Sequence, residues 1–397
     1  MSESTPPIPS ACRLLPPAIV CSLGDGVDTI ADALIQGRRG LSVSDVFTPG
    51  RPLPLGQVTS PLSDDSTWPV HHRSRNNRLL HSALVKLGDA LNTVLSRYPR
   101  SRIGIVIGTS TSGIGDTEQA LAIAGRNDPL PASFRYAQQE LGAPALFVAE
   151  QLGITGPAYS LSTACSSSAR ALASARRLLR SGECDAVIAG GADTLCQLTV
   201  HGFASLEAVS DHPCLPFSAN RDGINLGEAA ALFVITRDEG GIQLAGTGES
   251  ADAYHVSAPR PDGSGAFAAM QAAIEQAGRT PHDIDYLNLH GTGTSHNDAM
   301  EAKAVTDLFG EALPLCSSTK ALTGHTLGAA GALEAAFCWL ALKRGFYPRH
   351  VHDGQYDTTL PWLPLTTTGD HRKPRVALSN SFAFGGNNAS LLLARTS

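Results

Sequence analysis

The sequence lacks the features that mark membrane-spanning and nucleic-acid-binding proteins. No uninterrupted apolar stretch approaches the roughly 20 residues needed to span a bilayer. The N-terminal segment 1–20 has too many prolines and too short an apolar run for a signal peptide. There is no basic excess, because 30 Lys and Arg residues stand against 36 Asp and Glu residues, which argues against nucleic acid or an anionic membrane as a partner. We therefore expect a cytoplasmic protein.

The eight cysteines also lack a pattern. They contain no C-x-x-C pair and are spread over 397 residues, so neither a disulfide framework nor a zinc site is expected. Most are predicted to be small buried apolar residues. The sequence has no tandem repeat and no low-complexity tract. Its 42% hydrophobic and 17% charged residues are typical of a folded globular protein with a large core.

Short apolar runs alternate with longer helical patterns, which predicts buried parallel strands joined by crossover helices. In each half of the chain one strand leads into a small-residue turn and then a helix, at Cys165 and again from Lys320. This parallel suggests two related α/β halves. The Pro- and Gly-rich segments 48–69 and 347–374 are predicted to be surface loops. The expected strands are 103–110, 158–163, 186–193 and 230–235 in the first half, and 284–293, 313–320, 375–386 and 389–394 in the second.

One cysteine stands out from the others. Cys165 lies in "LSTACSSSARAL", where an apolar run ends, and the spacing of Ala169, Leu172 and Leu179 predicts a helix that begins within the serine run. The unpaired N–H groups at a helix N-terminus lower the pKa of a nearby thiol and can also hold an oxyanion. A buried cysteine in a tight junction is the alternative, but the small neighbours leave the sulfur open to an acyl group.

Two histidines offer a partner for such a nucleophile. His290 lies in "LHGTGTSHND" and His325 in "STKALTGHTLGAAG", and both are set among glycines and threonines that suggest close approach by a ligand. His71, His72, His350 and His352 are interpreted instead as surface or hydrogen-bonded core residues.

Three further residues are candidates near these histidines. Lys320 and Glu334 flank His325 along the chain, and they are either surface residues or a buried pair that fixes the histidine loop. The segment "NSFAFGGNNASL" does not have the glycine order of a phosphate-binding loop. It is better interpreted as a mobile loop in which Phe384, if it is not an ordinary core residue, swings over a pocket.

The order Cys165, His290, His325 resembles the β-ketoacyl-acyl carrier protein synthases, the condensing enzymes of the thiolase fold. The segments that carry the resemblance are "TACSSS", "PFSANRDGINLGEAAALFV", "HGTGTSHND", "STKALTGHTLGAAGALEA" and "NSFAFGGNN", which together span about residues 100–395. It implies an α/β thiolase-like fold with two duplicated βαβαβαββ halves, in a helix–sheet–helix–sheet–helix body. We expect residues 1–240 to form the half with the cysteine and residues 241–397 the half with both histidines.

The resemblance also implies a role for each candidate residue. Cys165 is expected to be the acylated nucleophile, and His290 with His325 to promote decarboxylation of a malonyl group. Lys320 and Glu334 match the family's supporting pair. Thr292 and Thr294 match positions that bind the pantetheine amides. The backbone N–H groups of Cys165 and Phe384 would form the oxyanion hole, with Phe384 as a gate.

The expected activity is decarboxylative condensation of an acyl group with malonyl-acyl carrier protein, in elongation of a fatty acid, polyene or polyketide chain. No metal or cofactor is expected, because 4'-phosphopantetheine arrives on the carrier protein. The expected partners are that carrier and a second subunit, either an identical copy or a paralogue. The divergent N-terminal stretch and segment 347–364 favour a pathway-specific synthase. The alternatives are a non-catalytic chain-length-factor-like subunit, which usually lacks the cysteine, and a thiolase or acyltransferase, which is expected to need a second catalytic cysteine.

Overall fold

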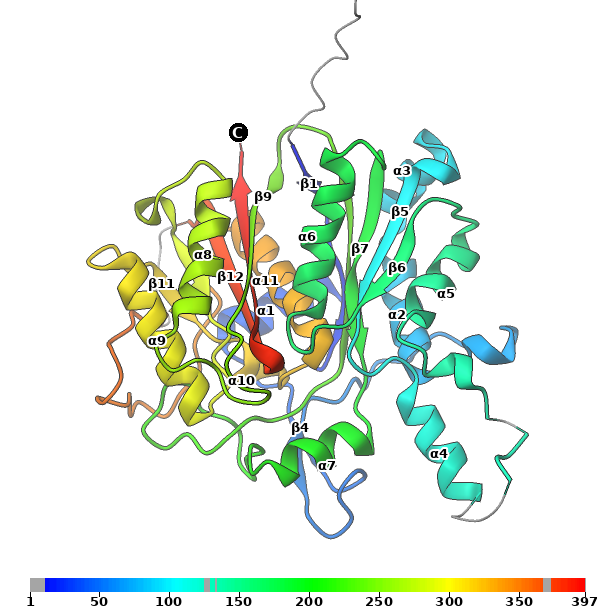
Figure 1. Ribbon diagram of the computed structural model, residues 1–397, viewed down its shortest axis with the longest axis horizontal. Coiled ribbons are helices and arrows are strands. Elements are labelled where there is room, and N and C mark those ends of the chain that lie inside the picture. The colour runs from blue at the N-terminus through cyan, green and yellow to red at the C-terminus, as the bar shows by residue number, and fades with distance from the viewer. Residues whose placement is uncertain (1–10, 125–128, 133, 367–372, 397) are drawn as a thin grey trace, which may run out of the picture.

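The computed structural model describes residues 11–124, 129–132, 134–366 and 373–396 (Figure 1). The strands in this part of the chain are β1 Arg13–Leu14, β2 Ala18–Cys21, β3 Ser42–Ser44, β4 Leu53–Leu55, β5 Ile103–Gly108, β6 Ala158–Leu161, β7 Ala186–Asp193, β8 Ala229–Thr236, β9 Ile242–Ala251, β10 Tyr286–Asn288, β11 Leu315–Ser317, β12 Val376–Ala383 and β13 Asn387–Arg395. The α-helices are α1 Val27–Gln36, α2 Arg75–Lys86, α3 Gly88–Arg97, α4 Ile114–Ala124, α5 Ala143–Leu152, α6 Ser167–Arg180, α7 Gln197–Ser205, α8 Ser264–Gln276, α9 Ser295–Phe309, α10 Lys320–Thr323 and α11 Ala330–Arg344. Short 3₁₀ turns include η1 Val70–His72, η5 Leu327–Ala329 and η6 Phe384–Gly386.

The two halves of the chain have the same strand order. In the first half the order is β6-β5-β7-β8-β2, and in the second it is β11-β10-β12-β13-β9. The three strands at the outer end of each half are parallel, and the next two pairings are antiparallel. β1 pairs with both β8 and β9 and so joins the two halves into one continuous sheet. The predicted thiolase-like fold with two duplicated halves is confirmed.

The layers follow from strands that are apolar on both faces. In β8 the side chains of Ala231, Phe233 and Ile235 belong to the core around α6 and α11, whereas Leu232 and Val234 belong to the core beneath α2, α3 and α5. A third core lies between the second half of the sheet and helices α8 and α9. Figure 1 shows the result, with α6 and α11 between the two halves of the sheet, α2, α3 and α5 outside one half, and α8 and α9 outside the other. Nearly continuous apolar runs are what strands buried on both faces require.

The central helices α6 and α11 approach each other closely. A Cβ atom on Gly331 of α11 would lie 2.6 Å from the backbone nitrogen of Ala169 in α6, so only glycine fits there. The halves are also joined by the buried Arg176 of α6, whose guanidinium donates to the carbonyls of Leu244 and Ala245 at 3.1 and 2.9 Å. The predicted boundary at residue 240 separates two sets of strands, and both sets pack against this central layer. The division into two domains at this residue stays a prediction.

Some expected elements differ from those observed. The runs 230–235 and 389–394 form antiparallel strands, β8 and β13, instead of parallel ones. For β13 the reason is its three-residue connection to β12, since a parallel pair needs a crossover of a dozen or more residues. The run 242–251, not predicted as a strand, forms β9.

The two predicted surface loops have different outcomes. Segment 48–69 contains the buried strand β4, because Leu53 and Leu55 pack against Leu195 and Val200, so the prediction of a loop was wrong there. Residues 347–366 form neither helix nor strand, as expected, although Leu360 and Leu363 anchor them in the core. Residues 367–372 lie outside the described part of the chain.

Candidate active site

Cys165 occupies a sharp turn between β6 and α6. Ala164, just before it, has φ of 51°, a left-handed conformation that is costly for any residue except glycine. The N–H of Ser167 donates to the Ala164 carbonyl at 3.1 Å and closes the turn. The turn can lie this close to β5 only because residue 108 is a glycine. A Cβ atom at Gly108 would lie 2.3 Å from the backbone nitrogen of Ser168. Helix α6 begins at Ser167, as the sequence predicted, so Cys165 lies at its N-terminal end.

The serine run that follows Cys165 has a structural role that the sequence did not reveal. The hydroxyl of Ser166 donates to the carbonyl of Thr163 at 2.9 Å, and that of Ser167 donates to Ala164 at 2.5 Å. The hydroxyl of Ser168 accepts the N–H of Ala332 in α11 at 2.9 Å. The run therefore fixes the nucleophile turn and links it to the second half of the chain.

His325 is held between α10 and α11 by segment 225–228, part of the quoted "PFSANRDGINLGEAA". Its N–H donates to the carbonyl of Asn225 at 2.7 Å, and its carbonyl accepts the N–H of Gly227 at 3.0 Å. The ring atom Nδ1 accepts the N–H of Leu327 at 3.2 Å. Because Nδ1 is an acceptor, a neutral ring carries its proton on Nε2, and this buried atom has no hydrogen-bond partner.

His290 follows β10, and its backbone is held by Glu301 of α9. The carboxylate of Glu301 accepts the N–H groups of His290 and Gly291 at 2.8 and 2.7 Å and the amide of Asn380 at 3.1 Å. Burial raises the pKa of Glu301 to about 7, and these hydrogen bonds oppose the rise. Nδ1 of His290 is buried without a hydrogen-bond partner, so no local contact fixes the tautomer of this ring.

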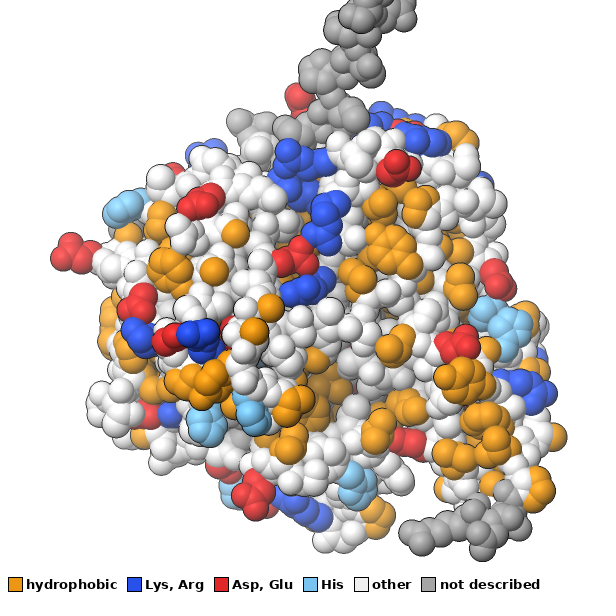
Figure 2. All heavy atoms as spheres, in the orientation of Figure 1, with side chains coloured by type: hydrophobic (Ala, Val, Ile, Leu, Met, Phe, Trp, Pro, Cys, Tyr) orange, Lys and Arg blue, Asp and Glu red, His pale blue; other side chains and the backbone are white. Residues whose placement is uncertain are grey.

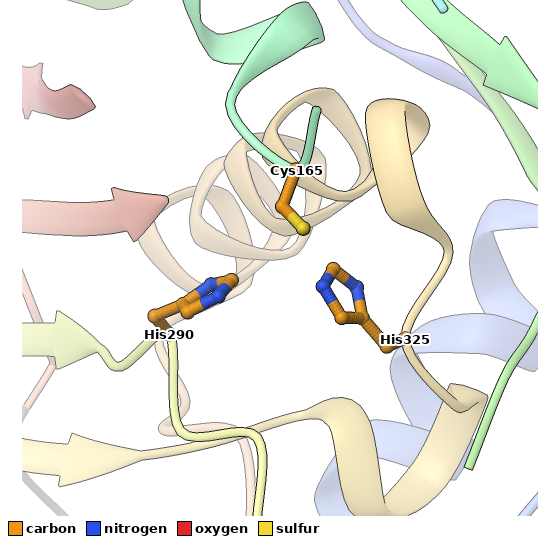
Figure 3. A group of neighbouring side chains, drawn as sticks. All are labelled: Cys165, His290 and His325. Atoms are coloured by element: carbon orange, nitrogen blue, oxygen red, sulfur yellow. The ribbon is translucent and has the colours of Figure 1, made fainter. Parts of the chain in front are cut away.

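The three predicted residues meet in space although 160 positions separate Cys165 from His325 in sequence. The sulfur and one nitrogen of each ring lie within 4.8 Å of one another, and the two imidazole rings are 5.3 Å apart at an interplanar angle of 83°. Figure 3 shows both rings directed toward the Cys165 sulfur. Burial, reinforced by the charge of Lys320, holds the pKa of both histidines well below its usual value. Both imidazoles are therefore neutral at pH 7.

The expected lowering of the Cys165 pKa was wrong. Burial raises the pKa of this thiol to about 11, although the charge of Lys320 and the backbone N–H groups of Phe384 and Cys165 act in the opposite direction. The physical reason is desolvation, because the side chain is only 5% exposed and a thiolate there loses most of its water. In the resting site Cys165 is a neutral thiol.

Of the two interpretations given for Lys320 and Glu334, the structure supports the buried pair and not two surface residues. Nζ of Lys320 lies 2.5 Å from Oε1 of Glu334, and both side chains are at most 3% exposed. The pair places a positive charge behind the two histidines, which is why the pKa of each imidazole is lowered further.

A cavity of about 470 Å³ opens onto Cys165, His290 and His325. Thr292 and Thr294 line it, and their hydroxyls lie 2.9 Å apart. Phe384 also lines it: its backbone N–H lowers the pKa of the Cys165 thiol, and its ring lies 5.4 Å from that of Phe203. The glycines after Phe384 have φ of 76° and 71°, so this segment needs backbone conformations that other residues rarely adopt. The placement matches what the resemblance implied, and the chemical roles remain predictions.

Besides Glu301, the sequence reasoning missed two further carboxylates that hold these loops in place. Asp193, fully buried at the end of β7, accepts hydrogen bonds from the backbone and hydroxyl groups of residues 109–111 and from the N–H of Gly328. Asp298 accepts the N–H groups of Thr292, Gly293 and Phe217 at 3.1, 3.2 and 2.8 Å. The available signal was an acidic residue that ends an apolar strand or begins a helix beside a glycine-rich turn.

The histidines interpreted as structural remain so. His350 is buried, accepts the N–H of Ser318 at 3.1 Å, and burial lowers its pKa to about 3. His71, His72 and Glu150 have donor atoms within 4.8 Å of one another. Nε2 of His72 lies 2.7 Å from the Glu150 carboxylate, however, and its Nδ1 is buried without a partner. A metal on Nε2 would leave a buried N–H on Nδ1 without an acceptor, so a hydrogen bond from Nε2–H to the Glu150 carboxylate explains this group better.

Fold and site together define a thiolase-fold protein in which a cysteine and two histidines meet at one cavity. The sequence matches the β-ketoacyl synthase N-terminal domain over residues 18–240 and the C-terminal domain over residues 242–353. The chain belongs to the β-ketoacyl synthase family. Its predicted class, an acyltransferase that acts as a β-ketoacyl synthase in chain elongation, is confirmed.

Similar proteins include 3-oxoacyl-[acyl-carrier-protein] synthases and solved ketosynthases. The 3-oxoacyl-[acyl-carrier-protein] synthase 2 of Staphylococcus aureus (strain COL) is 32% identical, over 94% of this chain and 95% of its own. The enzyme of the same name from Rhizobium meliloti is 36% identical over 74% of each chain. A chain of the solved complex between the ketosynthase ApeO and its chain length factor ApeC, from Xenorhabdus doucetiae, is 43% identical, with a TM-score of 0.92 and coverage of 99% of this chain and 100% of that chain. Among the described residues of this chain, no helix has both the length and the apolar character to cross a membrane.

Proposed function

We propose that this chain catalyses decarboxylative condensation of an acyl group held on Cys165 with a malonyl group delivered on an acyl carrier protein. The observation that carries the proposal is the convergence of the Cys165 thiol and two neutral imidazoles at the end of one cavity. No metal or cofactor is required, because each step uses a thiol, an imidazole or a backbone N–H.

In the first step the sulfur of Cys165 forms a bond to the acyl carbonyl carbon, and the carrier thiol leaves with a proton. Since the Cys165 pKa is raised to about 11, its proton must be accepted by a neighbouring group. His325 is fixed as a donor by Leu327, whereas the tautomer of His290 is free, so we assign the acceptor role to His290. The acyl oxygen, as it becomes negative, accepts the N–H groups of Cys165 and Phe384.

In the second step the bond from malonyl carbon to carboxylate breaks and CO2 leaves. The electron pair moves into the thioester, whose oxygen becomes an enolate and accepts N–H donors from His290 and His325. The enolate carbon then attacks the acyl group on Cys165, and the thiolate leaves and takes up a proton from water, because its original proton left with the carrier thiol. Neutral imidazoles suit this role because each offers an N–H donor without the cost of burying a cation. Thr292 and Thr294 are placed to hold the pantetheine arm, and Phe384 is the proposed gate.

The assay that tests the proposal is release of labelled CO2 from malonyl-carrier protein, run beside acyl transfer to Cys165 followed by intact mass. Cys165→Gln should abolish condensation while decarboxylation is retained or raised, because the amide imitates an acylated cysteine. His290→Ala and His325→Ala should each lower decarboxylation about a hundredfold or more, the scale seen when one oxyanion donor is lost. A chelator should leave all rates unchanged. Loss of decarboxylation in Cys165→Gln as complete as in the histidine variants would refute this division of labour.

We further propose that the active form is a dimer with a paralogous chain-length-factor-like subunit in the cytoplasm, serving a pathway-specific elongation such as that of a polyene or polyketide. Two similar solved ketosynthases, 43% and 27% identical, were determined with a chain length factor. The edge strand β6 ends the sheet and is half-buried. Beside it apolar side chains gather over α4 and α5 (Figure 2); exposed ones in this region are Leu121, Ile123, Leu141 and Leu146.

The subunit arrangement is tested by light scattering of the chain purified alone and after co-expression with the paralogue. We expect the co-expressed chains to form a heterodimer that condenses malonyl units. We expect the chain purified alone to be inactive or unstable. Replacement of Ile123, which is 77% exposed, by Asp should weaken the assembly, because a charge would be buried in the interface. Full condensation activity from the monomeric chain would contradict the proposal.

A further inference from the structure

The segment between β9 and α8 covers the cavity mouth beside the proposed gate. Ser257, Ala258 and Pro259 line the cavity together with Phe384. At the start of this segment Ala253 has φ of 47°, a conformation that non-glycine residues adopt only when other contacts enforce it. Those contacts lie within the segment and in η6.

His255 is the residue that shapes this turn. Its Nδ1 accepts the backbone N–H groups of Ser257 at 3.1 Å and Ala258 at 3.2 Å, although the side chain itself is exposed to solvent. An imidazole nitrogen that accepts two consecutive backbone N–H groups acts as a local cap, because the donors would otherwise have only water as a partner. Removal of the ring therefore leaves the turn without its internal acceptor.

The capped turn is bonded directly to the gate segment. The N–H of Gly385 donates to the carbonyl of Val256 at 2.8 Å, and the N–H of Asp252 donates to the carbonyl of Gly386 at 2.8 Å. Val256 lies between His255 and the two N–H groups that His255 caps. The orientation of the Val256 carbonyl is thus set by the His255 cap, and this carbonyl holds the residue that follows Phe384.

We infer that His255 is a positioning residue, whose Nδ1 holds the Val256 carbonyl against Gly385 and so keeps Phe384 over Cys165. In the closed arrangement Phe384 lines the cavity with Cys165, and its backbone N–H opposes the rise in the thiol pKa. Without the cap this arrangement loses part of its support, and the Cys165 thiol becomes more accessible. The inference rests on the proposed gate role of Phe384, and its test uses thiol access, which does not depend on condensation.

The experiment measures the rate of Cys165 alkylation by iodoacetamide at one fixed pH, by mass spectrometry of the peptide, in the intact protein. His255→Ala should raise the rate about fivefold, the effect of losing roughly one net hydrogen bond from the closed state. His255→Asn should return it to within about twofold of the unmodified protein, because the asparagine oxygen can accept the same N–H groups. A merely structural role of the ring would not be rescued by Asn.

The chain supplies a matched control. His352 makes the same kind of cap, with Nδ1 accepting the N–H of Gly354 at 2.9 Å, in a loop that does not line the cavity. His352→Ala should leave Cys165 alkylation unchanged. Equal rates in the unmodified protein and His255→Ala would overturn the inference, as would equally raised rates in His255→Ala and His255→Asn. The readout is access to the Cys165 thiol and does not depend on condensation. If the alkylation rates change as expected but decarboxylation fails, the result counts against the proposed function and not against the role of His255.

Discussion

At the scale of single residues, Cys165 combines a nucleophile's position with the protonation state of an ordinary buried cysteine. The N-terminus of α6 and the charge of Lys320 both favour the thiolate, but the loss of water around a side chain that is 5% exposed outweighs them. A site of this kind generates its thiolate during the reaction, when the neighbouring imidazole takes the proton, and protects the free enzyme from oxidation and alkylation.

This balance predicts the pH dependence of Cys165 alkylation. Because the raised pKa of about 11 leaves the thiol neutral over the whole range, the thiolate fraction and the iodoacetamide rate should rise about tenfold per unit from pH 7 to pH 9.5, without a plateau. Peptide mass spectrometry measures the rate, and Cys165→Ser provides the background. A plateau between pH 7 and pH 8 would mean instead that the helix terminus dominates.

The residues of the site could be predicted from sequence to the extent that each lies in a short motif with its own chemistry. Cys165, His290 and His325 belong to this group. The carboxylate of Asp193 was not predicted, because its partners lie in loops far away in sequence. The carboxylate of Asp298 was not predicted although Thr292 and Gly293 lie within six residues of it, because backbone N–H partners leave no residue-type pattern. The error over the thiol pKa has the same origin, since burial depends on how α11 and η6 close over Cys165, which no local pattern records.

At the scale of elements, the contact between α6 and α11 positions the nucleophile relative to His325. Gly331→Ala should therefore destabilise the protein by about 1–3 kcal/mol, because the added methyl meets backbone of Ala169 that cannot move freely. Gly202→Ala in α7, where nothing lies within 4 Å of the new Cβ, should stabilise by up to about 1 kcal/mol. Urea unfolding compares the two variants, and destabilisation of equal size in both would contradict the packing argument.

Elements with long uniform patterns were predicted well and short ones were not. β7 and β8 match their expected bounds to within a residue, because seven small or apolar residues in a row leave few alternatives. The first strand is divided into β1 and β2 by Pro16 and Pro17, which cannot donate to a ladder. Strand direction could not be predicted for β8, since it depends on a partner that local sequence does not specify.

At the scale of the whole molecule, the two halves share one sheet and one central layer. β1 lies between β8 and β9, and Nε1 of Trp339 in α11 donates to the carbonyl of Leu14 at 3.1 Å. Neither half can bury its face of α6 or α11 without the other. We therefore expect a single cooperative unfolding transition rather than one for residues 1–240 and another for residues 241–397.

Tryptophan variants can report on each half separately. Trp68 lies in the core of the first half and Trp339 in the central layer. A variant that keeps only Trp68 and one that keeps only Trp339 should each show a fluorescence transition that coincides with its own far-ultraviolet circular dichroism, at one fixed protein concentration. Separation of the Trp68 signal from the circular dichroism would show that the first half unfolds by itself.

The repeated strand order also bears on how selection can act on such an enzyme. α6 and α11 each connect the third and fourth strands of their own half, and each begins just after a residue that lines the cavity, Cys165 or His325. In the proposed reaction, one repeat thus supplies the group that carries the growing chain, and the other supplies a group that acts on the extender unit. The backbone of His325 is nevertheless held by Asn225 and Gly227 of the first half, so a mutation that shifts one repeat also acts on the other. A lineage that adopts a new starter must therefore make changes that keep the site for the extender unit intact.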